Sequence, residues 1–369
     1  METALFLLLG LALLGAGGEA LVRGASRLAA AAGISPLVVG LTVVAFGTST
    51  PELVVSGYAV LRGENAIAVA NVVGSNVFNV LFILGLCAAI APLAIHRQIW
   101  RREVPIMIAA SLLLLLFGLD GRIDELEAIA LLAGLVAHTI YSVVASRHEP
   151  AAAQAEAAHG ERLARPSRGG WPGSVLLVLA GLAALVLGAR WLVDAAVEIA
   201  RGLGVTESVI GLTIVAAGTS LPELAASLVA TLRGEREIAI GNVVGSNVFN
   251  VLGIVGVSGL LARGDLPVHP SLAGFDLPFM VAVAIATLPL FFSDRKLARW
   301  EGLLFLAYYA VYALYLVLRS TDHDALPFYS AVAFEFVLPL TGVTILVLAW
   351  RAVRAERARS PAAPGAEGP

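Results

Sequence analysis

The sequence predicts an all-α integral membrane protein of the inverted-repeat transporter type, with two five-helix halves and an extra C-terminal helix. Three observations lead to this fold class. Hydrophobic residues make up 59% of the 369 residues and charged residues only 14%, so the chain is far more apolar than a soluble domain. Several apolar stretches are long enough to cross a bilayer, and the two halves of the chain are near copies of each other.

A helix needs about 20 mostly apolar residues to cross a membrane. By this rule we expect eleven spans, near residues 3–21, 36–60, 66–93, 104–118, 125–145, 174–193, 207–232, 237–261, 275–292, 300–318 and 328–350. The first stretch has no basic residue ahead of its apolar run, so we interpret it as a membrane helix and not as a cleaved signal peptide. The spans divide the chain into a first repeat at 1–145, a polar linker at 146–173, a second repeat at 174–318, an extra span at 319–350 and a basic, disordered tail at 351–369.

The placement of lysine and arginine orients the spans, because cytoplasmic segments carry an excess of both. With the N-terminus outside, 18 of the 24 basic residues fall on inner segments. We therefore expect a multi-pass protein of the cell (inner) membrane, with the linker and the C-terminus inside. The lipid bilayer is its expected surrounding. The net charge of −3 gives no reason to expect nucleic acid, no protein partner is indicated, and a single cysteine, Cys87, excludes an intrachain disulfide.

A shift of 171 residues aligns Gly40–Gly85 with Gly211–Gly256 without a gap, and 32 of the 46 aligned positions are identical. Five spans precede the linker. Because five is odd, the second copy enters the membrane from the opposite side, which makes the halves inverted repeats. The charge flanking the first span of each half supports this, since Arg23 and Arg27 align with Asp194 and Glu198.

Each repeat places one glutamate, Glu52 or Glu223, in the middle of a span, where an ionisable side chain costs several kcal/mol and marks a functional site. Residues three, four and seven positions earlier share the face of the glutamate. These are Ser49, Thr48 and Ala45 beside Glu52, and Ser220, Thr219 and Ala216 beside Glu223. The following spans carry matching stripes at a spacing of four: Asn71, Ser75 and Asn79, and Asn242, Ser246 and Asn250.

Pro51 and Pro222 precede the two glutamates and lack a backbone N–H, which would free the carbonyls of Gly47 and Gly218. Carboxylates, hydroxyls, amide oxygens and carbonyls form an all-oxygen set, which hard cations such as Ca²⁺ and Na⁺ prefer. Two carboxylates carry a formal charge of −2, which one Ca²⁺ or two Na⁺ would cancel. An empty site would carry bare charge into a low dielectric, and this favours obligatory exchange.

At these residues the sequence resembles the cation/calcium exchanger superfamily, specifically prokaryotic sodium/calcium exchangers. The strings "GLTVVAFGTSTPEL" and "GLTIVAAGTSLPEL", each followed by "NVVGSN", carry the resemblance, which extends over roughly residues 3–318. It implies ten spans and a cation site at the middle of the membrane. The ligands that it implies are Ala45 and Ala216 through their carbonyls, with Thr48, Ser49, Glu52, Ser75, Asn79, Thr219, Ser220, Glu223, Ser246 and Asn250.

Two features depart from the family pattern. Some members have an aspartate where this chain has Asn79 or Asn250, so this site has two acids and not three. The span at 328–350 lies outside the ten-span pattern.

The sequence thus predicts a secondary active antiporter, not an enzyme, which has no cofactor and transports Ca²⁺ and Na⁺. An H⁺-coupled Ca²⁺ antiporter on the same scaffold is the alternative, and a passive cation channel is a weaker one. An intramembrane enzyme is disfavoured because the polar stripes hold no histidine, lysine or cysteine.

Several polar and small residues have a plain structural interpretation beside the functional one. Glycines at 40, 74, 211 and 245 suit helix packing as well as a ligand site. We interpret Asn71, Asn76, Asn242 and Asn247 as interhelical hydrogen bonders. His138 is interpreted as a helix-face histidine whose hydrogen bonds are satisfied.

Overall fold

The structure is a computed structural model that describes residues 2–147, 170–205, 210, 214, 216–293, 296–321, 323–331 and 342. Most of the predicted linker, nearly all of the predicted span at 328–350 and the tail at 351–369 lie outside the described residues.

Within the described ranges, eight helices are long and apolar enough to cross a membrane. A ninth is reached if Pro36–Thr48 and Thr50–Leu61, which meet at 42°, form one bent span. The all-α membrane class is confirmed, whereas the count of eleven spans and the inverted relation of the halves stay predictions.

The first half of the chain runs from α1 to α8, with π-helical or 3₁₀ segments labelled η. Its helical segments are α1 (Glu2–Ala32), α2 (Pro36–Val39), η1 (Gly40–Val44), α3 (Ala45–Thr48), α4 (Thr50–Leu61), α5 (Ala66–Val77), η2 (Phe78–Leu84), α6 (Gly85–Ile90), η3 (Ile99–Glu103), α7 (Val104–Phe117), η4 (Gly118–Asp120) and α8 (Glu125–Arg147).

The second half repeats this order as far as it is described. Its segments are α10 (Gly170–Gly202), α12 (Ala216–Gly218), α13 (Leu221–Arg233), α14 (Arg236–Phe249), η6 (Asn250–Val255), α15 (Gly256–Leu261), η7 (Leu272–Asp276), α16 (Leu277–Ser293), α17 (Arg299–Ser320) and α18 (Leu326–Ala331).

The helix that carries each glutamate is interrupted where the sequence predicts. Ser49 separates α3 from α4 with a ψ of 6°, and Ser220 precedes α13 with a ψ of 9°. Pro51 and Pro222 follow within two residues. Proline cannot donate to the preceding turn, so the helix ends before it and begins again at its first positions. Each glutamate therefore lies in the first turn of a new helix.

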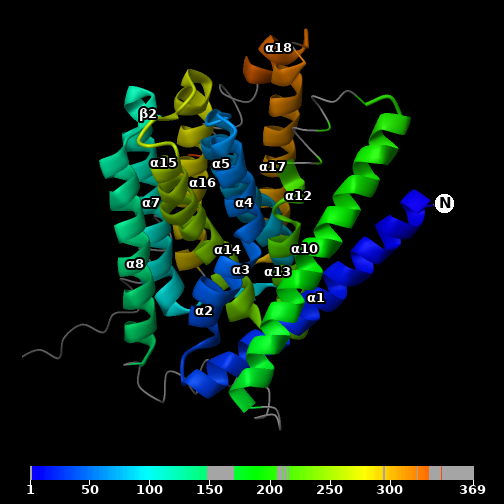
Figure 1. The fold of residues 1–369 in the computed structure, drawn as a ribbon, viewed down its shortest axis with the longest axis vertical. Coiled ribbons are helices and arrows are strands. Elements are labelled where there is room, and N and C mark those ends of the chain that lie inside the picture. The colour runs from blue at the N-terminus through cyan, green and yellow to red at the C-terminus, as the bar shows by residue number, and fades with distance from the viewer. Residues whose placement is uncertain are drawn as a thin grey trace, which may run out of the picture.

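The helices α1 and α10 lie side by side and lean away from the remaining bundle (Figure 1). They approach so closely that a Cβ on Gly17 would lie 2.9 Å from the carbonyl oxygen of Gly181, and a Cβ on Gly10 would lie 2.9 Å from that of Gly188. Both helices continue beyond the predicted spans 3–21 and 174–193. In α1 the extra turns keep a buried apolar face with Arg23 exposed, so nothing ends the helix before Gly33, whose φ is +63°.

Two short antiparallel strand pairs join the halves. The strand β1 (Leu93–Ala94) pairs with β4 (Lys296–Leu297), and β2 (Arg122–Ile123) pairs with β3 (Leu266–Pro267). In each pair one strand comes from the first half and one from the second. These strands could not be predicted from the sequence, because two residues are too few to show an alternating pattern.

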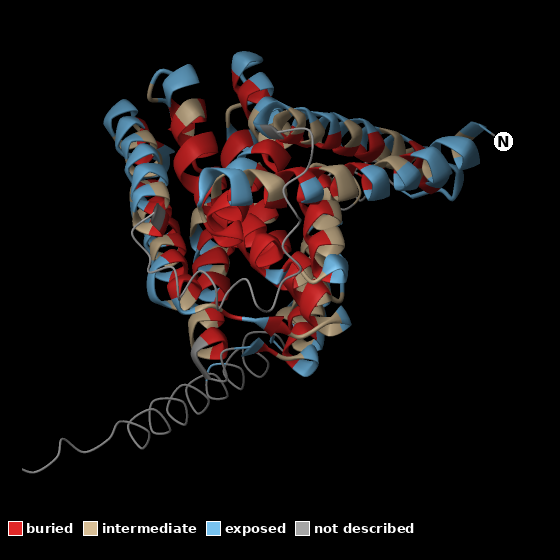
Figure 2. Cartoon of the chain, turned by 90° about the horizontal axis from the view of Figure 1, so that it is seen from below, coloured by how far each residue is buried: buried red, intermediate tan, exposed pale blue. Residues whose placement is uncertain are grey.

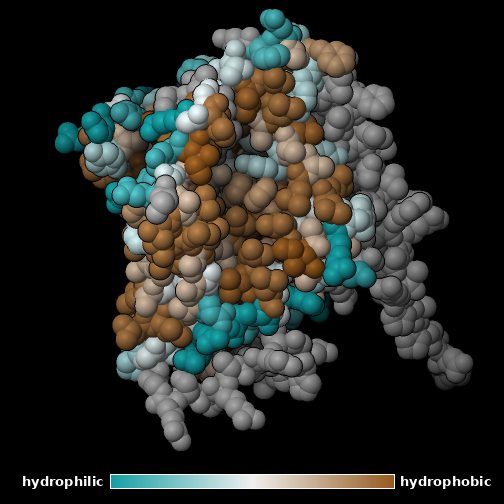
Figure 3. All heavy atoms as spheres, turned by 90° about the vertical axis from the view of Figure 1, so that its right-hand side faces the viewer, coloured by the Kyte–Doolittle hydropathy of each residue, from teal (hydrophilic) through white to brown (hydrophobic). Residues whose placement is uncertain are grey.

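The centre of the molecule is the continuous helix formed by α14, η6 and α15, in which every residue from Glu237 to Gly256 is buried. Figure 2 shows buried residues gathered at the middle of the bundle, with exposed ones toward the ends and along α1 and α10. On the face drawn in Figure 3, hydrophobic side chains form a broad band between hydrophilic edges. Outer helices contribute exposed apolar side chains such as Val54, Leu116 and Val136, as expected of a lipid-facing surface.

The glycines of the repeated motif differ between the halves. A Cβ on Gly245 would lie 2.5 Å from the carbonyl oxygen of Leu41, and one on Gly40 would lie 2.9 Å from that of Ile238, so these two glycines serve close helix packing. No described atom lies within 4 Å of the Cβ position of Gly74. Gly211 lies outside the described residues.

Candidate cation site

The two glutamates are buried at the helix interruptions and each is held by a serine of the other half. Both have side chains with no exposed surface. The hydroxyl of Ser220 donates to Oε1 of Glu52 at 2.8 Å, and the hydroxyl of Ser49 donates to Oε1 of Glu223 at 2.8 Å. Because a hydroxyl bound to a carboxylate is a charge-assisted hydrogen bond, this crosswise arrangement fixes the position of both acids.

The asparagines at 79 and 250 are also joined across the halves. The amide nitrogen of Asn79 donates to Oδ1 of Asn247 at 3.0 Å, and that of Asn250 donates to Oδ1 of Asn76 at 3.0 Å. In both residues the amide nitrogen is the atom that donates in this contact. The oxygen of each amide is then left as an acceptor.

Asn76 and Asn247 also cross-link the backbones of the two central helices. The side chain of Asn76 donates to the carbonyl of Asn247 at 3.2 Å, and that of Asn247 donates to the carbonyl of Asn76 at 3.3 Å. This agrees with their predicted role as interhelical hydrogen bonders. The sequence did not indicate that they also orient Asn79 and Asn250, which lie three residues further along each chain segment.

Asn71 and Asn242 hold the glutamate-bearing helices in place. Asn71 donates to the hydroxyl of Ser56 at 3.0 Å, and Asn242 donates to that of Ser227 at 2.9 Å. Both also donate to the backbone carbonyl of the nearby glutamate, at 3.4 Å and 3.2 Å. Their amides are therefore used for structure, as the sequence predicts.

The remaining predicted residues lie around this network. The hydroxyls of Ser75 and Ser220 lie 3.2 Å apart, and because Ser220 donates its proton to Glu52, Ser75 is the donor in this contact. Thr48 donates to Oδ1 of Asn242 at 3.0 Å. The carbonyl of Ala45 accepts the backbone N–H of Ser49 at 3.0 Å. In the second half Ala216 begins α12 and Thr219 follows its end, half-buried.

Five buried oxygen atoms of this region have no hydrogen-bond partner in the described part of the chain. They are Oε2 of Glu52, Oε2 of Glu223, Oδ1 of Asn79, Oδ1 of Asn250 and Oγ of Ser246. A buried polar atom without a partner costs about 1–3 kcal/mol, and more if it is charged. All five belong to the predicted ligand set. Such a gathering of acceptors around two acids suits a hard cation, which supplies charge without needing an acceptor of its own.

The central helices depart from regular α-helix at this site. The π-helical segment η6 begins at Asn250, and η2 begins one residue before Asn79. A π-helical turn widens the helix locally and is frequent at functional sites. No sequence signal marks these π-helical segments, because "NVFNVL" has ordinary helix-compatible residues in both copies.

Comparison with known proteins gives matches along nearly the whole described chain. Residues 2–144 and 173–318 match the family described as sodium/calcium exchanger protein. The chain is 35% identical over 294 residues to the inner membrane protein YrbG of Escherichia coli strain K12, covering 78% of this chain and 88% of YrbG. It is 31% identical over 343 residues to the sodium/calcium exchanger MaX1 of Methanosarcina acetivorans, covering 85% and 97%.

The solved structures include one similar in both fold and sequence. The sodium-calcium exchanger NCX_Mj, soaked with zero Na⁺ and Ca²⁺, superposes with a TM-score of 0.72 and 30% sequence identity. The match covers 84% of this chain and 97% of that one.

Proposed function

Because the chain belongs to the sodium/calcium exchanger protein family, we propose that it exchanges Ca²⁺ for Na⁺ across the membrane. The ions would pass by alternating access through the oxygen-lined site between Glu52 and Glu223. The observation that carries this proposal is the pair of fully buried glutamates, each held by a serine of the opposite half and each keeping one carboxylate oxygen without a hydrogen bond.

The proposed ligands are those that the sequence indicates. They comprise the carbonyls of Ala45 and Ala216 and the side chains of Thr48, Ser49, Glu52, Ser75, Asn79, Thr219, Ser220, Glu223, Ser246 and Asn250. The orientation of Asn79 and Asn250 supports this set, since no described group donates a hydrogen bond to either amide oxygen.

The charge of the site gives a physical reason for coupling. Two buried carboxylates without a cation are costly to hold in a low dielectric, so a site that changes access should do so only when it is filled. One Ca²⁺ or two Na⁺ would cancel the formal charge of −2. Asn79 and Asn250 are neutral, so the count rests on two acids alone.

We further propose that the N-terminus lies outside and that the 146–173 linker lies inside, in the cell membrane. The distribution of basic residues supports this orientation. A tag that is reactive only from one side of the membrane, placed at Glu2 or on the linker, would test it.

Reconstituted transport tests the proposed exchange. The protein is purified, sealed into liposomes loaded with Na⁺, and diluted into Na⁺-free medium that contains radioactive Ca²⁺, at equal pH on both sides. We expect Ca²⁺ uptake that stops when internal Na⁺ is replaced by K⁺ or choline. Ca²⁺ uptake that does not depend on Na⁺ but follows an imposed pH gradient would instead identify the H⁺-coupled alternative. Ca²⁺ flux that needs no counter-ion would identify a channel.

A further inference from the structure

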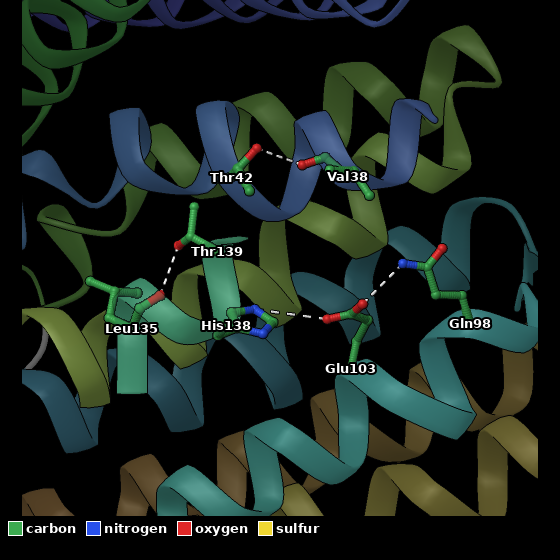
Figure 4. Close-up of polar contacts among 7 residues, drawn as sticks. All are labelled: Val38, Thr42, Gln98, Glu103, Leu135, His138 and Thr139. Atoms are coloured by element: carbon green, nitrogen blue, oxygen red, sulfur yellow. Dashed lines mark hydrogen bonds and ion pairs between the residues drawn. The ribbon is translucent and has the colours of Figure 1, made fainter. Parts of the chain in front are cut away.

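A second buried polar cluster lies away from the cation site, between the start of α7 and the middle of α8 (Figure 4). Glu103 is almost completely buried, and its Oε1 accepts the side-chain N–H of Gln98 at 3.0 Å. Its other oxygen, Oε2, lies 3.8 Å from Nε2 of His138. That distance is too long for a hydrogen bond and short enough for strong attraction between charges.

His138 contradicts the expectation of a satisfied helix-face histidine. It is only 8% exposed, and neither of its ring nitrogens has a hydrogen-bond partner in the described part of the chain. A neutral histidine in this place forgoes its hydrogen bonds. A protonated one would gain an ionic partner less than 1 Å beyond normal hydrogen-bond length.

The other half of the chain has an acid at the matching place with a different partner. Glu103 begins the string "EVPIM" and Asp276 begins "DLPFM". His138 follows Glu127 by eleven residues, and Tyr312 follows Glu301 by eleven, each glutamate receiving a backbone N–H at the start of its helix. The hydroxyl of Tyr312 donates to Asp276 at 3.1 Å.

The two pairs therefore differ in one respect that matters for protons. Tyrosine keeps its proton across the physiological range and can hold its acid at any such pH. Histidine changes its charge between about pH 5 and 8. Only the pair of the first half can thus make or lose its contact as the pH changes.

Other charged groups of the described chain lie on the elements packed around this pair. On α14, which packs against η3, Arg236 is exposed and Glu237 is buried. Within the described chain, the helical segments with the most extensive contact with α8 are α2, η6 and α15, and these three carry no titratable side chain. On η3, Arg101 and Arg102 are exposed, unlike Glu103. On α8 itself, Glu125 and Glu127 lie in the first turn, about three turns from His138.

The packing of α8 also connects the His138–Glu103 pair to the proposed cation site. A Cβ on Gly253 of η6 would lie 3.0 Å from the side chain of Leu135, one turn from His138. Asn250 begins the same segment η6. Further along α8, the hydroxyl of Ser146 accepts the backbone N–H of Ser35 at 3.0 Å, immediately before α2.

From this geometry we infer that His138 and Glu103 form a proton-binding site that regulates exchange, separate from the cation site. Binding a proton to His138 completes an ion pair with Glu103 and ties α8 to the start of α7. Because α8 packs against η6, the ion pair restrains the segment that carries Asn250, and exchange becomes slower. The site takes a proton as its ligand and moves no proton across the membrane.

The test compares pH profiles of Na⁺-driven Ca²⁺ uptake in liposomes with equal pH inside and outside. For the wild type we expect uptake to fall through a step as the pH is lowered between about 8 and 5. His138→Tyr copies the partner that Asp276 has, so we expect it to transport without that step. Glu103→Gln, which keeps the shape but removes the charge, should lose the step too. Any decline caused by protonation of Glu52 and Glu223 would remain in both variants.

Two further measurements keep the inference separable from the proposed function. In nitrogen-15 histidine spectra of the wild type, the signal that His138→Tyr removes should titrate, and Glu103→Gln should shift its midpoint. This readout needs no transport. The reciprocal change Tyr312→His should add a pH-dependent step. A step that persists unchanged in His138→Tyr, or a His138 signal that does not titrate, would overturn the inference.

Discussion

Glu52 and Glu223 are the only acids in the hydrogen-bonded network that surrounds the candidate site in the described chain, and each is fully buried. Replacing either with glutamine keeps the size of the side chain and removes one negative charge. We expect Glu52→Gln or Glu223→Gln to abolish or strongly reduce Ca²⁺ uptake in reconstituted liposomes, while the protein still inserts into the membrane. Glu64→Gln, at an exposed position between α4 and α5, is the matched control. Wild-type uptake by either buried variant would refute the site.

The two serines that hold these acids are not equivalent. Ser220 bonds both Glu52 and Ser75, whereas the only side-chain bond found for Ser49 in the described chain goes to Glu223. A hydrogen bond to a charged group is worth about 1.5–3 kcal/mol, so losing one should weaken Ca²⁺ binding by roughly tenfold or more. We expect both Ser49→Ala and Ser220→Ala to raise the KM for Ca²⁺, with the larger increase for Ser220→Ala. Equal KM values for wild type and both variants would show that these bonds do not act on the bound ion.

The sequence indicated the residues of the candidate site, but not how they pair. The repeated "GTSxPEL" places serine three residues before glutamate, and this spacing alone suggests a contact within one helix. In the structure the helix is broken at that serine, so its hydroxyl reaches the glutamate of the other half instead. A spacing rule describes one continuous helix and cannot anticipate a partner 174 residues away.

At the scale of helices, the close contact between α1 and α10 depends on glycines, which have no side chain to separate the two backbones. A methyl group on Gly17 would lie 2.9 Å from backbone atoms of Gly181 and Leu185, whereas Gly15, two residues earlier, is exposed and meets nothing within 4 Å among the described atoms. We expect Gly17→Ala to lower the melting temperature in detergent, since overpacking costs about 1–3 kcal/mol. Gly15→Ala is the control and should leave it unchanged or slightly higher, because alanine favours helix. Equal melting temperatures for the two variants would contradict the close contact.

Helix positions could be predicted from apolar run length, but helix ends could not. The run-length rule counts only the part of a helix that lies in lipid. It therefore missed the last turns of α1, where Val22, Ala25 and Ala29 are buried. Of the arginines between them, Arg23 is exposed and Arg27 is half-buried. The π-helical turns at Asn79 and Asn250 also have no sequence signature, since both segments consist of ordinary helix-forming residues.

At the scale of the whole molecule, the two strand pairs of the described chain connect the halves outside the candidate cation site. Ala94 and Lys296 face each other in the β1–β4 pair, and both are exposed. We expect a disulfide between Ala94→Cys and Lys296→Cys to leave Na⁺-driven Ca²⁺ uptake intact, because it strengthens a contact that the fold already makes. Each single cysteine variant serves as a control. Loss of uptake on oxidation, with recovery on reduction, would show that this strand pair must open during exchange.

The architecture of the chain was predictable where the sequence is repetitive. The repeat drew attention to both glutamates and to both asparagine-bearing helices, because the same residues recur at matching positions in the two copies. The joints between the copies, including the strand pairs and the Asn76–Asn247 cross-link, arise only when two copies meet in space. The sequence of either segment alone carries no signal that shows which residues of the other copy it contacts.

The crosswise bonds have a consequence for how the protein is assembled. Neither half holds its own glutamate with its own serine, so a separate half would expose an acid that has lost its hydroxyl donor. If the candidate site binds Ca²⁺, ion binding and the association of the two halves are coupled equilibria, as thermodynamic linkage requires. If residues 1–147 and 170–369 were produced as two chains, Ca²⁺ should strengthen their association in the same proportion as association strengthens the binding of Ca²⁺.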